Sequence, residues 1–304
     1  AEVLKSLGRF TEALSAYDAV IAEHPEEIIA KNGRAEVLKS LGRFTEALSA
    51  YDAVIAEHTE SVVAKSGRAE VLKSLGRFTE ALSAYDAVIA KHPESVVAKS
   101  GRAEVLKSLG RFTEALRAYD TVIIEHPEDV VVKTGRSCIL AIMGDDARAL
   151  VNLTEHNLAT RSDWIGYHIR GMIMLRAGKL DEAISIFKKG VEDDPWVLDR
   201  DYFRTALSIA HLRRFEYIEA SKTLENVMSA DLQIPANILR LHSFGALKRT
   251  DRASDAYRVV SEDRRPIIFE LTKELHRRYI INQSGQHDDE WLVRNEINVL
   301  LMAA

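Results

Sequence analysis

A glycine returns every 34 residues between residue 8 and residue 178 of this 304-residue chain. The positions are Gly8, Gly42, Gly76, Gly110, Gly144 and Gly178. An alanine follows each of them five residues later, and residues 35–68 differ from residues 69–102 at only two places, Glu57/Lys91 and Thr59/Pro93. A fixed period of this length indicates one supersecondary unit repeated many times, so it constrains the fold more than any local motif does.

Within one period the apolar residues are spaced as on helices. One stripe with steps of three and four consists of Phe10, Ala13, Leu14, Tyr17, Val20 and Ile21. The other helix of a unit has a second apolar stripe, which consists of Ile29, Gly33, Val37, Leu38 and Leu41. The segment "LGRF" around Gly42 predicts a helix end with glycine in the left-handed conformation, and the proline in "HPE" at 24–26 predicts the end of the second helix. The repeated alanine, such as Ala47, is expected where two helices approach most closely. Each unit is therefore predicted to be a helical hairpin that must stack on its neighbours to bury its apolar stripes.

The unit at residues 164–197 carries the features that resemble a known family. Tyr167 stands at an aromatic place near the start of the first helix, and further signature places hold Gly171, Gly178, Ala183, Phe187, Gly190 and Pro195. This pattern resembles the tetratricopeptide repeat family, well over residues 1–235 and loosely over 236–260. The resemblance implies an all-α fold, a right-handed superhelical solenoid of stacked 34-residue helix-turn-helix hairpins with a C-terminal helical cap.

The similarity between repeats predicts three segments within one continuous solenoid. Residues 1–136 form four near-identical units, residues 137–260 form diverged units, and residues 261–304 form the cap. After residue 204 the period drifts, but "HLRRFEYIEASKTLENV" and "ALKRTDRASDAYRVV" are still interpreted as hairpins, with Ala220 and Ala253 at the alanine place. The segments 266–282 and 288–302 are predicted to be cap helices.

Composition excludes some classes of protein. With 41 basic and 46 acidic residues the net charge is −5, which disfavours a nucleic-acid-binding protein. Apolar runs such as 138–143 are too short to cross a bilayer. The single cysteine, Cys138, cannot form an internal disulfide, so we expect a reducing, cytoplasmic environment. Because the chain starts at Ala1 inside a repeat, it is expected to be a fragment of a longer protein.

Catalytic motifs are not found in the sequence, and we expect no enzyme activity, cofactor or metal. The ladder of His24, His58, His92 and His126 is interpreted as helix-end residues, because stacked hairpins hold equivalent residues too far apart to share a metal ion. Cys138 is interpreted as a small buried hydrophobe, with a reactive thiol as the alternative. The basic residues between 240 and 278 are interpreted as a solvated helical surface, with an acidic partner or nucleic acid as the alternative.

The family resemblance implies that the first helix of each hairpin lines a concave groove. In the copied units its lining is polar, with Glu and Lys three residues apart and able to pair: Asn32, Glu36, Lys39, Ser40, Ser66, Glu70, Lys73, Ser74, Ser100, Glu104, Lys107 and Ser108. From residue 134 it becomes more apolar: Thr134, Cys138, Ala141, Ile142, His168, Met172, Leu175, Arg176, Tyr202, Ala206, Ile209 and Ala210. This contrast predicts that a helix or short peptide of a partner protein binds the apolar stretch around 134–210.

The sequence therefore predicts a non-catalytic scaffold that binds a partner protein or peptide. The alternative is a regulatory or sensing arm of a larger enzyme or effector complex. The C-terminal segment 288–302 leaves three possibilities open, since its apolar face includes Val293, Ile297 and Leu300. It caps the last hairpin, folds back into the groove, or pairs with a second copy of itself.

Overall fold

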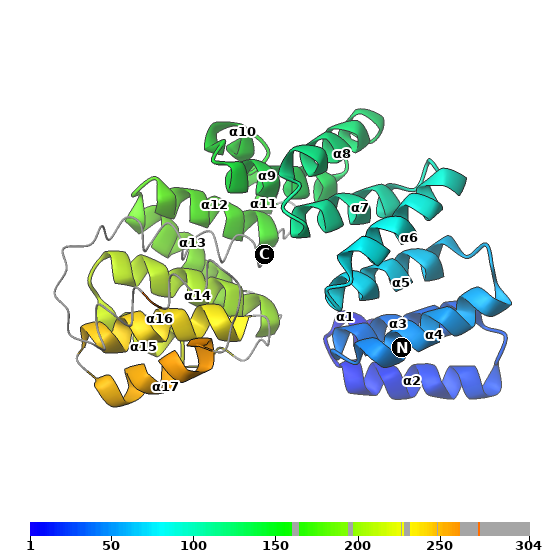
Figure 1. Ribbon diagram of the computed structural model, residues 1–304, viewed down its shortest axis with the longest axis horizontal. Helices are drawn as coiled ribbons and strands as arrows, with labels where there is room; N and C mark the ends of the chain where they lie inside the picture. Colours follow the sequence, from blue (N-terminus) through cyan, green and yellow to red (C-terminus); the bar gives the residue numbers. More distant parts are fainter. Residues whose placement is uncertain are drawn as a thin grey trace. The chain divides into compact units, whose positions relative to one another are not determined.

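The computed structural model describes residues 1–159, 164–193, 197–225, 227, 232–247, 249–261 and 273. Over these residues the regular secondary structure is helical, and consecutive helices pack against each other as hairpins (Figure 1). The predicted all-α fold of stacked hairpins is confirmed. The chain divides into two compact units, Ala1–Ile139 (unit 1) and Leu140–Ala304 (unit 2). The predicted division into 1–136, 137–260 and 261–304 rests on repeat similarity, and it stays a prediction.

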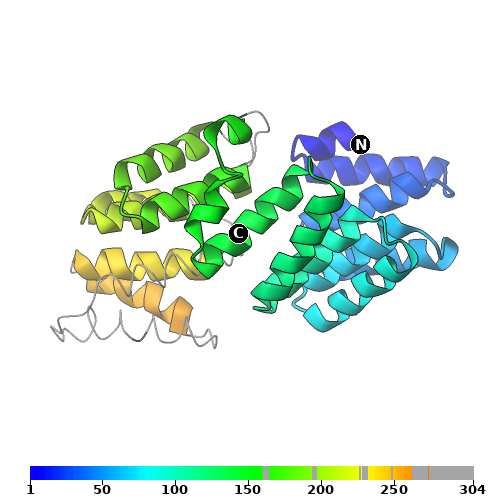
Figure 2. The same ribbon diagram turned by 90° about the horizontal axis from the view of Figure 1, so that it is seen from above.

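Unit 1 consists of alternating first and second helices of successive hairpins (Figures 1 and 2). The first helices are α1 (Glu2–Ser6), α3 (Ile28–Ser40), α5 (Val62–Ser74), α7 (Val96–Ser108) and α9 (Val130–Met143). The second helices are α2 (Phe10–Glu23), α4 (Phe44–Glu57), α6 (Phe78–Lys91) and α8 (Phe112–Glu125). Helix α9 begins in unit 1 and ends in unit 2.

The turn inside each hairpin is built on the repeated glycine. Gly42 has φ +71°, which is the left-handed conformation that the sequence predicts. Its amide donates to the Lys39 carbonyl at 2.9 Å, and the Arg43 amide donates to the Leu38 carbonyl at 2.9 Å. These two bonds satisfy carbonyls that the helix end leaves free. The turn therefore ends α3 and starts α4 within a few residues.

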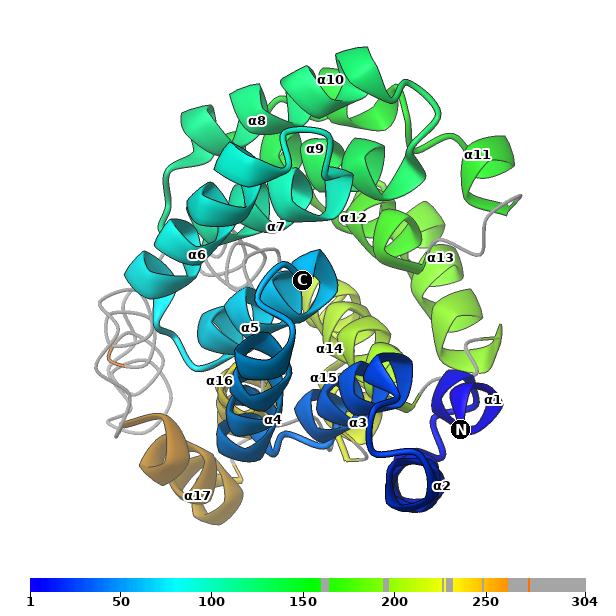
Figure 3. The same cartoon turned by 90° about the vertical axis from the view of Figure 1, so that its right-hand side faces the viewer.

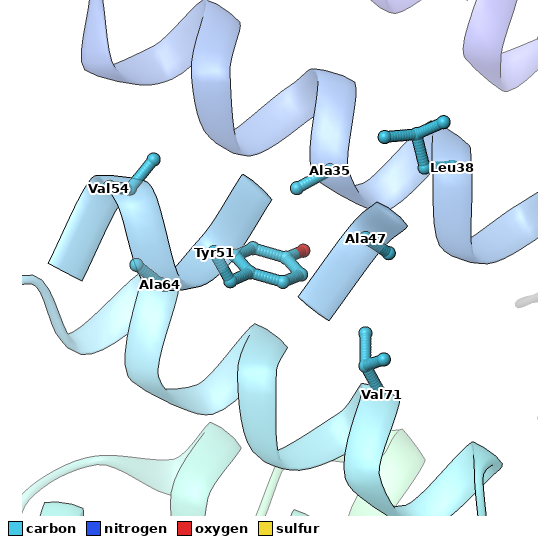
Figure 4. Packing of buried hydrophobic residues seen from close by; sticks show 7 residues of the cluster. All are labelled: Ala35, Leu38, Ala47, Tyr51, Val54, Ala64 and Val71. Carbon is cyan, nitrogen blue, oxygen red and sulfur yellow. The ribbon is translucent and has the colours of Figure 1, made fainter. Parts of the chain in front are cut away.

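The core of unit 1 repeats around a buried tyrosine in each second helix. Tyr51 of α4 lies between Ala35 of α3 and Ala64 of α5, close to Ala47 of its own helix (Figure 4). Its ring also fills the space over Gly67, where a Cβ atom would lie 2.3 Å from Tyr51 Cζ. The tyrosine thus joins one hairpin to the next, because it packs against the first helices on both sides.

The repeated alanine is fully buried at every place that the sequence indicates, from Ala13 to Ala253. We expect Ala47→Leu to lower the free energy of unfolding by about 1–3 kcal/mol, because the larger side chain overpacks the cluster around Tyr51. Chemical denaturation followed by far-UV circular dichroism measures this change. Ala53→Leu on the exposed side of the same helix is the control and should leave stability nearly unchanged.

An arginine in each of the first helices α3, α5, α7 and α9 makes a second link between hairpins. In unit 1 its Nε donates to an aspartate of the preceding second helix, as in Arg68–Asp52 at 2.6 Å, and the same pair recurs at Arg34–Asp18, Arg102–Asp86 and Arg136–Asp120. In unit 2 the equivalent Arg170 donates to the Leu153 carbonyl at 2.8 Å. The helix before Arg170 is short, so a free backbone carbonyl replaces the aspartate as acceptor.

Unit 2 keeps the hairpin arrangement with more irregular second helices. Its elements are α10 (Asp146–Leu150), α11 (Glu155–Ala159), α12 (Trp164–Arg176), α13 (Leu180–Asp193), α14 (Val197–Arg213), α15 (Tyr217–Thr223), α16 (Gln233–Ala246) and α17 (Thr250–Ser261). The two hairpins predicted after residue 204 are confirmed as α14–α15 and α16–α17. The predicted cap beyond residue 261 lies outside the described residues, Lys273 excepted.

The hairpin whose turn contains Gly144 lacks the single long second helix that the repeat predicts. Its second helix is broken into α10 and α11, which Figure 3 shows as short separate pieces. Thr154 lies between them, and its hydroxyl accepts a hydrogen bond from the Asn157 amide at 3.3 Å. Threonine in this position caps the start of a new helix rather than continuing the old one. The 34-residue spacing of the turn glycines thus continues to Gly178, although the second helix of this hairpin is interrupted.

Phe215 occupies the turn place that glycine holds in the earlier hairpins, with φ +60° and a side chain that is 67% exposed. A non-glycine residue in this conformation costs about 1–3 kcal/mol. We therefore expect Phe215→Gly to stabilise unit 2 by about 1 kcal/mol, because relief of the backbone exceeds the loss of an exposed ring.

Tryptophan fluorescence reports this change selectively, since Trp164, Trp196 and Trp291 all belong to the sequence of unit 2. The reverse change, Gly178→Phe, is the matched variant and should destabilise unit 2, because Gly178 has φ +76°. A Phe215→Gly protein that is less stable than the parent would contradict the explanation.

Candidate functional site

The polar lining of unit 1 consists of linked tyrosine, glutamate and lysine side chains. Glu70 pairs with Lys73 at 2.9 Å on the same helix, as the sequence predicts, and accepts a hydrogen bond from the Tyr85 hydroxyl at 3.0 Å. Glu104 pairs with Lys107 at 2.9 Å and also accepts from Tyr119. Glu36 differs, because its partner is Lys5 of the preceding hairpin, at 2.7 Å.

These contacts fix the protonation of the lining. Burial of Glu70 opposes ionisation, but the charges of Lys73 and Lys39 and the hydrogen bonds from Lys73 and Tyr85 outweigh it, so its pKa is lowered. Burial and the neighbouring carboxylate of Glu70 raise the pKa of Tyr85. The carboxylates therefore stay ionised and paired with lysines, and this part of the surface offers a partner little net charge.

An exposed aliphatic side chain stands three or more residues before each polar cluster, on the same face of the first helix. Ile29 is followed at helical spacing by Asn32 and Glu36, and its equivalents are placed identically. We call this row the aliphatic ladder: Ile29 (70% exposed), Val63 (65%), Val97 (68%) and Val131 (76%). The copied units were predicted to have a polar lining, and Ile29 was predicted to lie on an apolar stripe that packs between helices. The second prediction is wrong at Ile29, because this residue lies at the exposed start of the helix.

A row of carboxylates accompanies the aliphatic ladder. An exposed glutamate lies three residues before each of its members, and we call these four the acidic row: Glu26, Glu60, Glu94 and Glu128. Glu60 is close to Lys91 at 3.2 Å and to Lys65 at 3.8 Å. The other members of the acidic row have no lysine or arginine partner among the described residues. The edge of the ladder is therefore acidic, whereas its other side is charge-paired.

The structure buries most of the apolar positions that the sequence assigned to a partner. Nine of the twelve are at most 7% exposed: Thr134, Cys138, Ala141, His168, Met172, Leu175, Ala206, Ile209 and Ala210. Ile142, Arg176 and Tyr202 are half-buried. The expectation that this stretch offers an open apolar surface is wrong for the nine, because helix packing inside the chain already covers them. Whether it binds a partner stays a prediction.

His168 shows how closely this region is packed. Its ring lies 5.8 Å from Phe203, 5.9 Å from Tyr202 and 6.2 Å from Phe187, measured between ring centroids. Both ring nitrogens are buried and lack a hydrogen bond of normal geometry. Burial lowers the pKa of His168 to about 4, and the Tyr202 backbone opposes this shift only in part. The imidazole is therefore neutral at pH 7.

Two arginines hold neighbouring first helices of unit 2 together at helix ends. Arg176 donates to the Ala141 carbonyl at 2.8 Å and pairs with Asp146, and Arg213 donates to the Leu175 carbonyl. Each arginine satisfies a carbonyl in the last turn of another helix, where a cation is favoured. Arg176, predicted to face a partner, is thus engaged within the chain.

Cys138 is buried, and burial together with the Glu104 charge raises the pKa of its thiol against the opposing effect of Lys107. A protonated, inaccessible thiol is a poor nucleophile. We expect 5,5′-dithiobis(2-nitrobenzoate) to label it at least about tenfold more slowly in the folded chain than in denaturant, as followed by the absorbance of the released thiolate. Rapid labelling of the folded protein would support the reactive-thiol alternative.

The histidine ladder lies at helix ends, as predicted. His24, His58, His92 and His126 are the C-cap residues of the second helices, where their backbone amides donate to the preceding turn. The imidazoles of His24 and His92 lie beside Glu26 and Glu94, at 3.8 and 3.4 Å. Within the described part of the chain, no three His, Cys, Asp or Glu side chains gather as metal ligands would.

Part of the basic surface predicted in the C-terminal part of the chain lies within the described residues. Arg249 and Arg252 of the predicted basic surface lie over the Phe244 ring, and Arg258 pairs with Asp255 at 3.3 Å. The segments 266–282 and 288–302 lie outside the described residues, so self-association through 288–302 stays a prediction. None of the helices in the described ranges has the length and apolar character needed to span a membrane.

The sequence matches a family model described as tetratricopeptide repeat, over residues 1–61 and 67–130. The matched residues therefore consist of tetratricopeptide repeats, and the fold of this family generally mediates protein–protein interaction. Members are typically non-catalytic scaffolds. No curated protein matches the sequence.

Solved structures share the fold at low sequence identity. A tetratricopeptide repeat protein from Parabacteroides merdae is 16% identical with a TM-score of 0.55, covering 90% of this chain and 95% of that one. A chain of the APC/C hetero-tetramer Cut9–Hcn1 is 15% identical with a TM-score of 0.68, covering 90% and 54%. The human IFIT1 dimer with m7Gppp-AAAA is 16% identical with a TM-score of 0.63, covering 97% and 73%. These similarities concern the fold alone.

Proposed function

We propose that the chain is a non-catalytic scaffold that holds a partner protein on the first helices of unit 1. The observation that carries this proposal is the aliphatic ladder, whose four side chains are 65–76% exposed at one equivalent place in successive hairpins. Single exposed aliphatic residues are common on protein surfaces, but an ordered row of them marks an interaction surface. The tetratricopeptide repeat fold supports a protein as the partner.

The side chains of the aliphatic ladder contribute little to folding, so packing inside the chain does not explain why they are aliphatic. In the same helices the neighbouring Ala64 and Val71 are fully buried, and they supply the packing between hairpins. A polar residue at Val63 would satisfy the fold equally well. The four segments have three different sequences, "EEII" once, "ESVV" twice and "EDVV" once, and each has an aliphatic residue at the exposed place.

The stretch around 134–210 keeps its place in the proposal as a second surface. Its half-buried side chains Ile142 and Tyr202 are the parts that a partner reaches without moving the chain. The partner site there is correspondingly smaller than the sequence suggests. The cytoplasmic location also stays a prediction.

Site-specific photo-crosslinking tests the proposal in cell extract. A benzophenone amino acid replaces Val63 or Val97 of the aliphatic ladder, Tyr202 of the second surface, or Ile124, which is 81% exposed on the second helix α8. We expect the same protein to be crosslinked from Val63 and Val97 and not from Ile124. Crosslinks that form equally well from Ile124, or from none of the positions, would contradict a partner site on the ladder.

A further inference from the structure

We infer that the aliphatic ladder of unit 1 binds an extended segment of polyproline II type, with an aliphatic side chain at every third position and a lysine or arginine beside it. This inference rests on the proposed function and names the chemistry of the partner. It follows from two features of the surface, its period and its charge.

The period comes from the packing of first helices. Helix α3 contacts α5, α5 contacts α7, and the start of α9 shares a buried cluster with α7. The axes of packed helices lie about 8–10 Å apart, so we expect this spacing between successive members of the aliphatic ladder. A polyproline II helix rises about 3.1 Å per residue with three residues per turn, which brings every third side chain to the same face at about 9 Å. Four such side chains therefore match the four members of the ladder.

Other regular conformations fit this period less well. A β-strand places side chains on one face at about 6.6 Å or 13 Å, so its spacing falls out of step with the ladder. An α-helix advances about 10.5 Å in seven residues, so it reaches the ladder with one residue in seven. Four contacts then need 22 residues instead of 10, with less apolar burial for each residue that is ordered.

The preference for a basic partner follows from the charged side chains on the two sides of the aliphatic ladder. On one side Glu70 and Glu104 are neutralised by Lys73 and Lys107. On the other side the acidic row is exposed, and only Glu60 has lysine partners among the described residues. A partner with cationic side chains between its aliphatic positions matches this edge, whereas an acidic partner is repelled.

The test measures binding of fluorescent peptides to the full chain by anisotropy. The probe carries four Leu-Lys-Pro triplets, and the comparison peptide has the same composition with its four leucines consecutive. We expect the triplet peptide to bind at least tenfold more tightly, which corresponds to about 1.4 kcal/mol. Equal affinity of the two peptides would overturn the inference, because it would show that charge alone attracts them.

Surface variants test the placement. Val63→Ser/Val97→Ser should weaken triplet-peptide binding about tenfold through lost apolar contact, whereas the matched Ile124→Ser variant should not change it. Both changes concern exposed residues, so circular dichroism should show the parent fold. An equal loss in the Ile124→Ser protein, or no loss in the double variant, would overturn the placement of the segment on the ladder.

Charge variants test the chemistry of the intervening positions. Glu26→Gln/Glu94→Gln/Glu128→Gln should weaken binding and reduce its salt dependence, because exposed charges interact through a screened field. A triplet peptide with Glu in place of Lys should not bind. A leucine-heptad helical peptide that binds the ladder more tightly than the triplet peptide would replace the extended segment by a helix.

The peptide and crosslinking results can fail independently. Crosslinks from Val63 without triplet-peptide binding would contradict the extended basic segment and leave the scaffold proposal standing. Peptide binding that fails together with crosslinking from the aliphatic ladder would contradict both.

Discussion

Tyr85→Ala is expected to lower the free energy of unfolding of unit 1 by about 3–5 kcal/mol, the range for removing a buried aromatic side chain. Tyr85 is 2% exposed and packs against both neighbouring first helices, with its ring over Gly101, where a Cβ atom would lie 2.3 Å from Tyr85 Cζ. The loss therefore removes a contact between hairpins as well as one within a hairpin. Denaturation followed by the far-UV signal measures it.

The contribution of the Tyr85 hydroxyl group to stability can be measured separately from that of the ring. Tyr85 donates to Glu70, whereas Tyr51, which is equally placed, makes no side-chain hydrogen bond among the described residues. We expect Tyr85→Phe to cost about 1 kcal/mol more than Tyr51→Phe, because only the former breaks a hydrogen bond to a carboxylate. A Tyr85→Ala protein within about 1 kcal/mol of the parent would show that the hairpins do not depend on this packing.

Acid is expected to destabilise unit 2 through His168. Its pKa in the folded chain is about 4, below its ordinary value of 6.5, because burial disfavours the imidazolium. The folded state thus prefers the neutral ring. The contribution of the neutral His168 ring to the free energy of unfolding is fully present above pH 6.5 and is lost as the pH drops towards 4. The loss is about 3 kcal/mol, since each pKa unit corresponds to about 1.4 kcal/mol.

His168→Leu isolates this contribution from other titrating groups. Leucine has a similar volume and removes two buried nitrogens that lack hydrogen bonds, so stability at pH 7 should be equal or higher. Urea unfolding at pH 7, 5.5 and 4, followed by tryptophan fluorescence, should show a smaller acid loss in the variant by about 3 kcal/mol. Identical acid losses in the two proteins would mean that His168 is solvated or already charged.

Much of the fold was predictable because the repeat specifies it locally. The glycine at 42 and the alanine at 47 encode a turn and a close helix contact, and both lie as expected. The break between α10 and α11 was not predictable from the period, since it depends on a capping threonine at 154 within an otherwise regular spacing. The role of Phe215 was also not predictable, because only the backbone shows that this phenylalanine adopts the conformation of the turn glycines.

The candidate site was predicted less well than the fold. Helical register placed Met172 and Ile209 on the first-helix face, but register alone does not show which neighbours cover a side chain, and both are fully buried. The pairing of Glu70 with Lys73 was predictable from a spacing of three, whereas that of Glu36 with Lys5 joins two adjacent hairpins and has no such local signal. Ile29 was wrongly predicted to lie on a buried stripe, because its helical spacing matches that of the buried Val37 although it stands at the exposed start of the helix.

The central claim is that unit 1 holds its partner on the aliphatic ladder, and methyl NMR of the full chain with isotope-labelled isoleucine and valine tests it most directly. The signals of Val63, Val97 and Val131 should move when the triplet peptide is added, while Ile124 and Val151, which are exposed elsewhere, should stay unchanged. Shifts that fall equally on Ile124 and Val151, or a ladder whose signals do not move while the peptide is bound, would contradict the claim.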